Sequence, residues 1–164
     1  MIAHQERVAA PLGTILPMRE PRTLDSLEVL EAEAAAFAHS LVPNDAHATL
    51  VTLSGGLGAG KTTFTQSVAR TLGVTEPVTS PTFVLAKSYP LPAGNAFSTL
   101  VHIDAYRLEE GKDLVPLAFD EMMRDAGTLV MLEWPEMVAD GLPAADVAIT
   151  LAPVSDTSRT ISYA

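Results

Sequence analysis

The sequence has 164 residues, of which 48% are hydrophobic, and this predicts one globular domain whose core needs no disulfides. It contains no cysteine, which excludes a thiolate zinc site and a cysteine nucleophile. Ten basic and twenty acidic residues give a formal net charge of −10, which argues against a protein that binds a nucleic-acid backbone by itself. An acidic surface suits a basic protein partner better.

The sequence contains no apolar run that approaches the ~18 residues of a membrane span, so no membrane association is expected. Its first residues lack a basic region followed by an apolar segment, so no secretory signal is expected either. A cytoplasmic protein is the default interpretation.

The first part of the chain, residues 1–22, contains three prolines and is interpreted as an N-terminal extension with a short edge strand at residues 13–16. The folded domain is expected over residues 23–164. Its first element is a predicted helix, which starts at a capping box over residues 25–28 and runs to about Leu41.

The next unit combines a strand, a glycine-rich loop and a helix, and it matches the phosphate-binding pattern G-x-x-x-x-G-K-[ST]. A buried strand is predicted over residues 49–54 and a helix over residues 64–72, closed by Gly73. Backbone N–H groups of such a loop bind the phosphates of a nucleotide. The predicted nucleotide-binding residues are Gly55, Gly56, Leu57, Gly58, Ala59, Gly60, Lys61, Thr62 and Thr63.

Within this loop, two side chains have predicted roles. Lys61 is expected to reach the β- and γ-phosphates as a positive charge and to act in catalysis, and Thr62 is expected to place its hydroxyl on Mg²⁺. The chain is therefore expected to bind a nucleoside triphosphate together with Mg²⁺.

The remaining predicted elements alternate strands with helices and turns. In chain order they are a loop and then a strand over residues 77–87, a turn at 90–95, a strand at 99–104, a helix at 114–124, a strand at 128–133, and a hairpin of strands at 146–151 and 160–163. This order indicates an α/β fold, namely a P-loop NTPase three-layer sandwich with a mostly parallel central sheet and a C-terminal antiparallel hairpin.

Two of these strands end in a carboxylate, Asp104 and Glu133. Because the carboxyl ends of parallel strands face the ligand crevice, both side chains are expected at the metal and the attacking water. We assign Glu133 to Mg²⁺ together with Thr62, and Asp104 to positioning the water, while the reverse assignment stays open. His102, inside the same apolar strand as Asp104, is interpreted as a core histidine, and Trp134 as core packing.

The segment Ser80-Pro81-Thr82 is typical of a switch element, because its hydroxyls can sense a γ-phosphate or complete the metal shell. The alternative interpretation is a turn followed by an edge strand. Ser80 and Thr82 are therefore candidates for switch-like residues.

Four motifs in this order resemble one family. They are Gly58-Ala59-Gly60-Lys61-Thr62-Thr63-Phe64, Val78-Thr79-Ser80-Pro81-Thr82-Phe83, His102-Ile103-Asp104-Ala105-Tyr106-Arg107-Leu108 and Glu133-Trp134-Pro135-Glu136. Together they make the chain, over about residues 24–163, similar to the TsaE (YjeE) family, the bacterial ATPases of tRNA threonylcarbamoyladenosine biosynthesis.

The resemblance implies a weak ATPase that associates with the TsaB–TsaD pair, in which TsaD transfers threonylcarbamoyl to adenosine 37 of tRNA. Contact with tRNA is then indirect, through these partners. The resemblance also implies that Thr62 and Glu133 bind Mg²⁺, that Asp104 is functional, and that Arg159 contributes to the adenine pocket.

Three other function classes remain as alternatives at this point. A small-molecule kinase usually carries an arginine-rich lid, and the seven arginines here are scattered. A GTPase switch is disfavoured because the guanine-specific N-K-x-D motif is absent. A non-enzymatic nucleotide-gated binding module differs from the ATPase only in whether hydrolysis matters.

Overall fold

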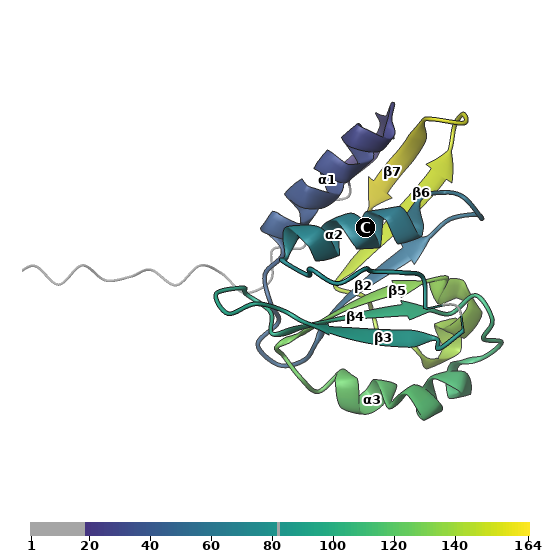
Figure 1. The fold of residues 1–164 in the computed structure, drawn as a ribbon. Coiled ribbons are helices and arrows are strands. Elements are labelled where there is room, and N and C mark those ends of the chain that lie inside the picture. The colour runs from purple at the N-terminus through teal and green to yellow at the C-terminus, as the bar shows by residue number, and fades with distance from the viewer. Residues whose placement is uncertain (1–18, 82) are drawn as a thin grey trace, which may run out of the picture.

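The computed structural model describes residues 19–81 and 83–164, and within them seven strands form one sheet (Figure 1). The order across the sheet is β1-β7-β6-β2-β5-β4-β3. The strands are β1 (Arg19–Leu24), β2 (Thr49–Ser54), β3 (Ala86–Pro90), β4 (Thr99–Asp104), β5 (Thr128–Glu133), β6 (Val147–Pro153) and β7 (Arg159–Tyr163).

The centre of this sheet is parallel and its edges are antiparallel. β2 pairs in parallel with β5 and β6, and β5 pairs in parallel with β4. The pairs β3–β4, β6–β7 and β1–β7 are antiparallel. The predicted α/β fold with a mostly parallel centre and a C-terminal hairpin is therefore confirmed, and the strands predicted at 49–54, 99–104 and 128–133 have the observed bounds.

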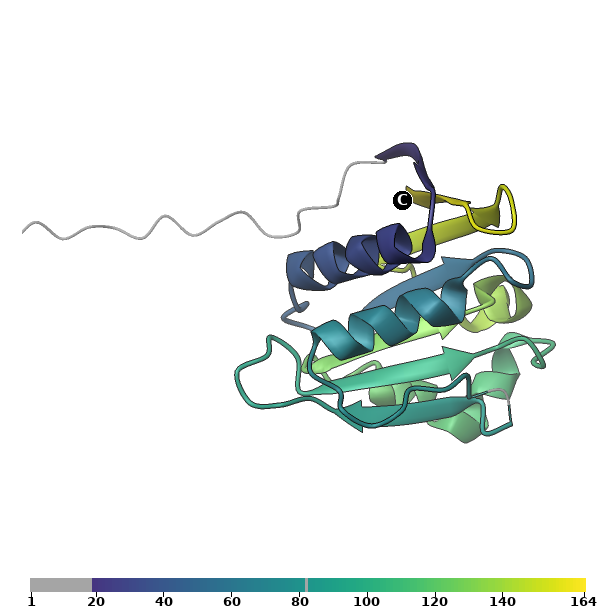
Figure 2. The same ribbon diagram turned by 45° about the horizontal axis from the view of Figure 1, so that its top comes forward.

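Helices cover both faces of the sheet. α1 (Leu27–Ser40) and α2 (Lys61–Thr71) lie on one face, and the short helices η1 (Gly111–Leu117), α3 (Phe119–Met122) and η2 (Pro135–Gly141) lie on the other (Figures 1 and 2). Among the residues described, no helix is both long and apolar enough to cross a membrane.

The buried side chains accordingly form two clusters, one on each face. On β5, Leu129 and Met131 join the cluster beneath α1 and α2, whereas Val130 and Leu132 join the opposite one. All six β5 residues are buried, as expected for a parallel strand covered on both faces. Side chains at odd positions of β5 therefore face α2, and Glu133 is one of them.

The helix termini differ from the predictions by a few residues. α1 is capped by Ser26, whose Oγ accepts a hydrogen bond from the Val29 N–H at 3.3 Å. Because Val29 occupies the position where a capping box needs Glu or Gln, the predicted box over residues 25–28 is wrong. α2 begins at Lys61 and not at residue 64, so the end of the phosphate-binding motif is itself helical.

Two further predictions of local structure are wrong. The helix predicted over residues 114–124 is split into η1 and α3 at Ala118, where φ is 53°. Pro116 lies inside η1, and the left-handed backbone of Ala118 ends that helix before α3 begins. The strand predicted in residues 77–87 begins only at Ala86, because Leu85 has φ of 64° and interrupts the extended chain.

The N-terminal part of the described chain belongs to the sheet. β1 pairs with β7, and Arg22 forms an ion pair with Glu33 of α1. The Tyr163 hydroxyl donates to the same carboxylate at 2.6 Å. The predicted division between residues 22 and 23 thus falls inside β1. The edge strand predicted at residues 13–16 lies outside the described residues.

We predict that Phe37→Ala lowers the free energy of unfolding by about 3–5 kcal/mol, because it opens a cavity between α1, α2 and β7. The Phe37 ring lies 5.5 Å from that of Phe64 and 5.8 Å from that of Tyr163, centroid to centroid. Urea denaturation measures the change. Val42→Ala, at a position that is 78% exposed, is the control and is expected to change stability by less than about 0.5 kcal/mol. Equal effects of the two substitutions would contradict the prediction.

Candidate functional site

The loop between β2 and α2 has a backbone that only glycine adopts easily. Gly55 has φ of 146°, and Gly60, the N-cap residue of α2, has φ of 102°. A Cβ at Gly55 would lie 2.2 Å from the Leu151 carbonyl oxygen. Because Gly60 has no side chain to cap the helix, the first N–H groups of α2 stay available to an anionic ligand.

Lys61 occupies the first turn of α2 and its side chain is held against the loop. Its Nζ donates hydrogen bonds to the carbonyl oxygens of Gly55 at 2.5 Å and Gly56 at 3.0 Å. It also lies 3.9 Å from the centre of the Trp134 ring, a cation–π contact. Burial lowers the pKa of Lys61, and the carboxylates of Glu133, Glu136 and Asp104 oppose that shift.

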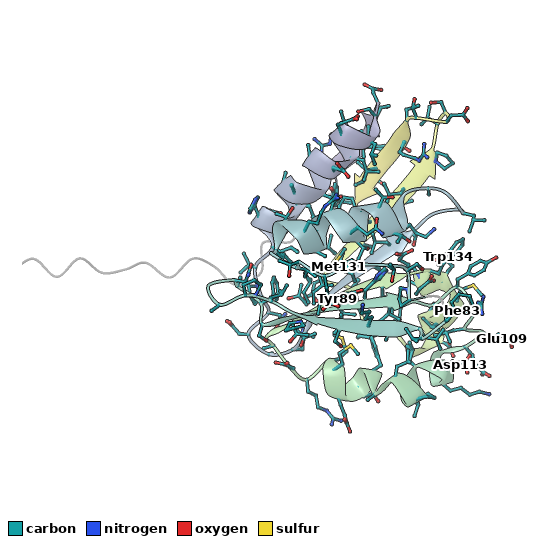
Figure 3. All side chains as sticks on the ribbon, in the orientation of Figure 1. Phe83, Tyr89, Glu109, Asp113, Met131 and Trp134 are labelled. Carbon is teal, nitrogen blue, oxygen red and sulfur yellow. The ribbon has the colours of Figure 1, made fainter. Side chains whose placement is uncertain are left out.

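Trp134 was expected to be core packing, and the structure adds a contact at the site. Its backbone is left-handed, with φ of 60°, and its N–H donates to the Leu53 carbonyl at 3.1 Å. Its ring meets that of Tyr106 at 5.0 Å as well as the Lys61 ammonium. Figure 3 shows Trp134 and Phe83 toward the side of the molecule where β4 ends, with Tyr89 and Met131 in its middle. In the sequence, the one feature that pointed to a role of Trp134 at the site is its position directly after a glutamate that ends a strand.

Both strand-end carboxylates lie at the same edge of the sheet. Asp104 pairs with Glu133 in the parallel register of β4 and β5, and Leu53 of β2 pairs with Glu133 on its other side. Glu133 Oε2 accepts a hydrogen bond from the Thr62 hydroxyl at 3.1 Å. The structure therefore brings the two predicted metal ligands together, from β5 and from the start of α2.

These two residues fit a magnesium ion by the chemistry of their donor atoms. Mg²⁺ prefers hard oxygen ligands and is usually held by one or two protein groups, with water and substrate phosphates completing the shell. Over residues 19–81 and 83–164 no group of three or more His, Asp or Glu side chains could hold a metal. Thr62 and Glu133 are thus suited to an ion that arrives with a nucleotide.

Asp104 is buried and its carboxylate is oriented by its neighbours. Its Oδ2 accepts a hydrogen bond from the Ser80 hydroxyl at 2.9 Å, and its Oδ1 accepts one from the Tyr106 N–H at 3.0 Å. The predicted switch-like residue Ser80 therefore contacts a predicted catalytic carboxylate. Thr82, the other switch-like candidate, lies outside the described residues.

His102 is buried in β4, as expected for a core histidine, but its partner is at the site. Its Nε2 lies 2.7 Å from Glu133 Oε1. Sequence reasoning missed this contact, because the spacing of residues 102 and 133 carries no signal until β4 and β5 are known to be neighbours.

A cleft of about 240 Å³ opens in front of these residues. Its lining consists of Leu57, Gly58, Ala59, Gly60, Lys61, Thr62, Thr63, Glu133, Trp134 and Arg159. Arg159 comes from the start of β7, and its guanidinium donates to the carbonyls of Ser155 and Ser158, each at 2.9 Å. A larger cavity of about 490 Å³ between η1, α3 and η2 contains none of the predicted site residues.

This chain is similar to known proteins in sequence and in fold. The family model described as "Threonylcarbamoyl adenosine biosynthesis protein TsaE" matches residues 25–161. The tRNA threonylcarbamoyladenosine biosynthesis protein TsaE of Bacillus subtilis is 36% identical over 129 residues, which are 79% of this chain and 73% of that protein. Its counterpart in Treponema pallidum is 39% identical over 116 residues, 71% of this chain and 82% of that one. The crystal structure of Bacillus subtilis YdiB has a TM-score of 0.69 and 28% identity, over 89% of this chain and 85% of that one.

The loop geometry predicts that substitution of one glycine lowers stability strongly, whereas substitution of its neighbour hardly changes it. Gly55→Ala is expected to cost about 2 kcal/mol or more, because its Cβ meets the Leu151 carbonyl and its φ is positive. Gly56→Ala is the matched control, since a Cβ there meets nothing within 4 Å, and it is expected to change stability by less than about 0.5 kcal/mol. Thermal and urea unfolding measure both. A Gly55→Ala protein as stable as Gly56→Ala would refute the loop geometry.

Proposed function

The chain belongs to the TsaE family, which acts in the biosynthesis of threonylcarbamoyladenosine in tRNA, and we propose that it is a Mg²⁺-dependent P-loop ATPase. In this proposal it hydrolyses ATP slowly by itself and supports the threonylcarbamoylation of adenosine in tRNA by acting on a TsaB–TsaD complex. The family match supports a role in this biosynthetic pathway. The contacts around Glu133 support the proposed ATP hydrolysis.

One observation supports the ATPase proposal above the others, namely the 3.1 Å hydrogen bond between the Thr62 hydroxyl and Glu133 Oε2. It joins a residue of the phosphate-binding motif to a strand-end carboxylate, which is the pair that holds Mg²⁺ in P-loop NTPases. When bound, the ion supplies charge stabilisation to the transferred phosphoryl group. Thr62 and Glu133 are the residues that would hold it.

The other residues of the site have separate roles in this proposal. The loop residues 55–63 bind the phosphates through their N–H groups, with Lys61 exchanging its carbonyl contacts for the β- and γ-phosphate oxygens. Asp104, held by Ser80, orients the attacking water. Ser80 and Thr82 sense the γ-phosphate, and Arg159, at the rim of the cleft, contacts the nucleotide.

Slow turnover by the isolated protein follows from the composition of the cleft. Arginines that stabilise transition-state charge accelerate P-loop NTPases by ~10³–10⁵-fold. Among the described residues that line the cleft, Arg159 is the one arginine, and its guanidinium is bound to carbonyls of its own hairpin. An activating group from a partner would supply the missing charge. This composition also disfavours a small-molecule kinase, which needs several arginines to clamp its substrate.

Indirect contact with tRNA is the second part of the proposal, and the charge of the chain supports it. With a formal net charge of −10 and three lysines, Lys61, Lys87 and Lys112, the protein has little positive charge for a phosphate backbone. Lys61 is committed to the site, and Lys87 and Lys112 form ion pairs with Glu76 and Glu110. The TsaB–TsaD partners would therefore hold the tRNA.

We expect Glu133→Gln to separate metal binding from nucleotide binding. The substitution keeps the shape of the side chain but removes its charge, so Mg²⁺-dependent ATP hydrolysis should fall by about 10–100-fold or more. Affinity for ATP in EDTA, measured by calorimetry, should stay within a few fold. Lys61→Ala should lose affinity under both conditions. Wild-type rates for Glu133→Gln at limiting Mg²⁺ would rule out its metal role.

Addition of the cognate TsaB–TsaD complex is expected to increase ATP hydrolysis at least about tenfold, because the partner completes the charge of the site. The measurement is the steady-state release of phosphate with and without the complex. Lys61→Ala is the control that identifies the source of the phosphate, since it should abolish the stimulated rate. Unchanged hydrolysis, together with no association between the folded proteins, would contradict the proposed partnership.

A further inference from the structure

His102 is a buried polar residue with one hydrogen-bond partner and one unsatisfied atom. It has no exposed surface, and its Nε2 lies 2.7 Å from Glu133 Oε1. Its Nδ1 is buried and has no hydrogen-bond partner among the described residues. An apolar side chain in the middle of β4 would avoid the free-energy cost of burying an unpaired nitrogen. The contact with Glu133 is therefore the feature that distinguishes a histidine here.

The position of His102 on the sheet directs its ring to the carboxylate of Glu133. His102 pairs with Met131 and Asp104 pairs with Glu133 in the parallel register of β4 and β5. Side chains two residues apart on one strand share a face, so His102 is the diagonal neighbour of Glu133 on the face covered by α2.

Both oxygens of Glu133 are consequently occupied, and by different elements. Oε1 contacts His102 of β4, and Oε2 accepts from Thr62 of α2. An ionised carboxylate only accepts hydrogen bonds, so a hydrogen bond to ionised Glu133 requires a proton on His102 Nε2. The carboxylate is thereby held by one oxygen while the other faces Thr62.

We propose that His102 is a positioning residue for Glu133: its Nε2–H holds Oε1 so that Oε2 stays turned toward Thr62 and the metal. The inference rests on the proposed Mg²⁺–ATP function. Carboxylates that ligate metals are commonly oriented by such hydrogen bonds, and loss of the orienting group costs about 10–100-fold in metal affinity. Without His102, the Glu133 side chain would be free to rotate away from Thr62.

The test measures the Mg²⁺ requirement for nucleotide binding in His102→Leu and His102→Gln. Trp134 is the one tryptophan of the sequence and contacts Lys61, so its fluorescence reports binding of a non-hydrolysable ATP analogue. For His102→Leu, the Mg²⁺ concentration at half-saturation should rise about 10–100-fold. His102→Gln, whose amide can donate to Glu133, should stay within a few fold of wild type. Affinity in EDTA should be unchanged in both variants.

Thr65→Val is the control for loss of a buried polar atom near the site. Thr65 lies in α2, is buried, and its hydroxyl has no hydrogen-bond partner among the described residues. This variant should keep the wild-type Mg²⁺ requirement. If it shifts that requirement as much as His102→Leu does, the effect is general to the core and the proposal is overturned.

Three further results distinguish failure of this inference from failure of the proposed function. A wild-type Mg²⁺ requirement in His102→Leu would overturn the inference alone. Absence of any Mg²⁺ requirement in the wild-type protein would overturn both. Nitrogen-15 NMR of the unmutated protein needs no variant to fold. It should find the His102 ring protonated at Nε2, and a proton on Nδ1 alone would overturn the positioning role, because Glu133 would then have to be the donor.

Discussion

The parallel register of β2, β5 and β4 is the constraint on which the candidate site depends. Glu133 at the end of β5 pairs with Leu53 of β2 on one side and with Asp104 of β4 on the other. Because parallel strands end at the same edge of a sheet, the glycine loop that follows β2 opens beside both carboxylates. A slip of one residue would turn Glu133 to the face opposite α2 and away from Thr62.

This arrangement concentrates charged and polar groups in a part of the molecule that is otherwise apolar. Lys61, Asp104, Glu133 and His102 are all buried. Lys61 donates to the Gly55 carbonyl, Asp104 accepts from Ser80, and His102 contacts Glu133. Buried charges are expensive unless they are paired and hydrogen-bonded, and these contacts offset part of that cost. The same low dielectric would strengthen the cluster's interactions with a nucleotide's phosphates.

The backbone beside the strand ends is also unusual. Leu85 and Trp134 adopt left-handed conformations, with φ of 64° and 60°. Both are bound to strand ends, since the Asp104 N–H donates to the Leu85 carbonyl at 2.9 Å and the Trp134 N–H donates to the Leu53 carbonyl at 3.1 Å. Such conformations cost about 1–3 kcal/mol in non-glycine residues and cluster at functional sites. At Trp134, this conformation turns the chain directly after β5, where the Trp134 ring lies 3.9 Å from Lys61 Nζ.

The sequence by itself determined the α/β class, the buried strands at 49–54, 99–104 and 128–133, and the glycine-rich loop that leads into a helix. These features are local, because apolar runs, glycine spacing and a following helix are all contiguous in the chain. The tertiary structure alone decided the contact of His102 with Glu133, the stacking of Trp134 on Lys61 and the inclusion of β1 in the sheet. It also decided the break at Ala118 and the late start of β3. Each of these depends on strand neighbours or on single backbone angles, which no periodic pattern encodes.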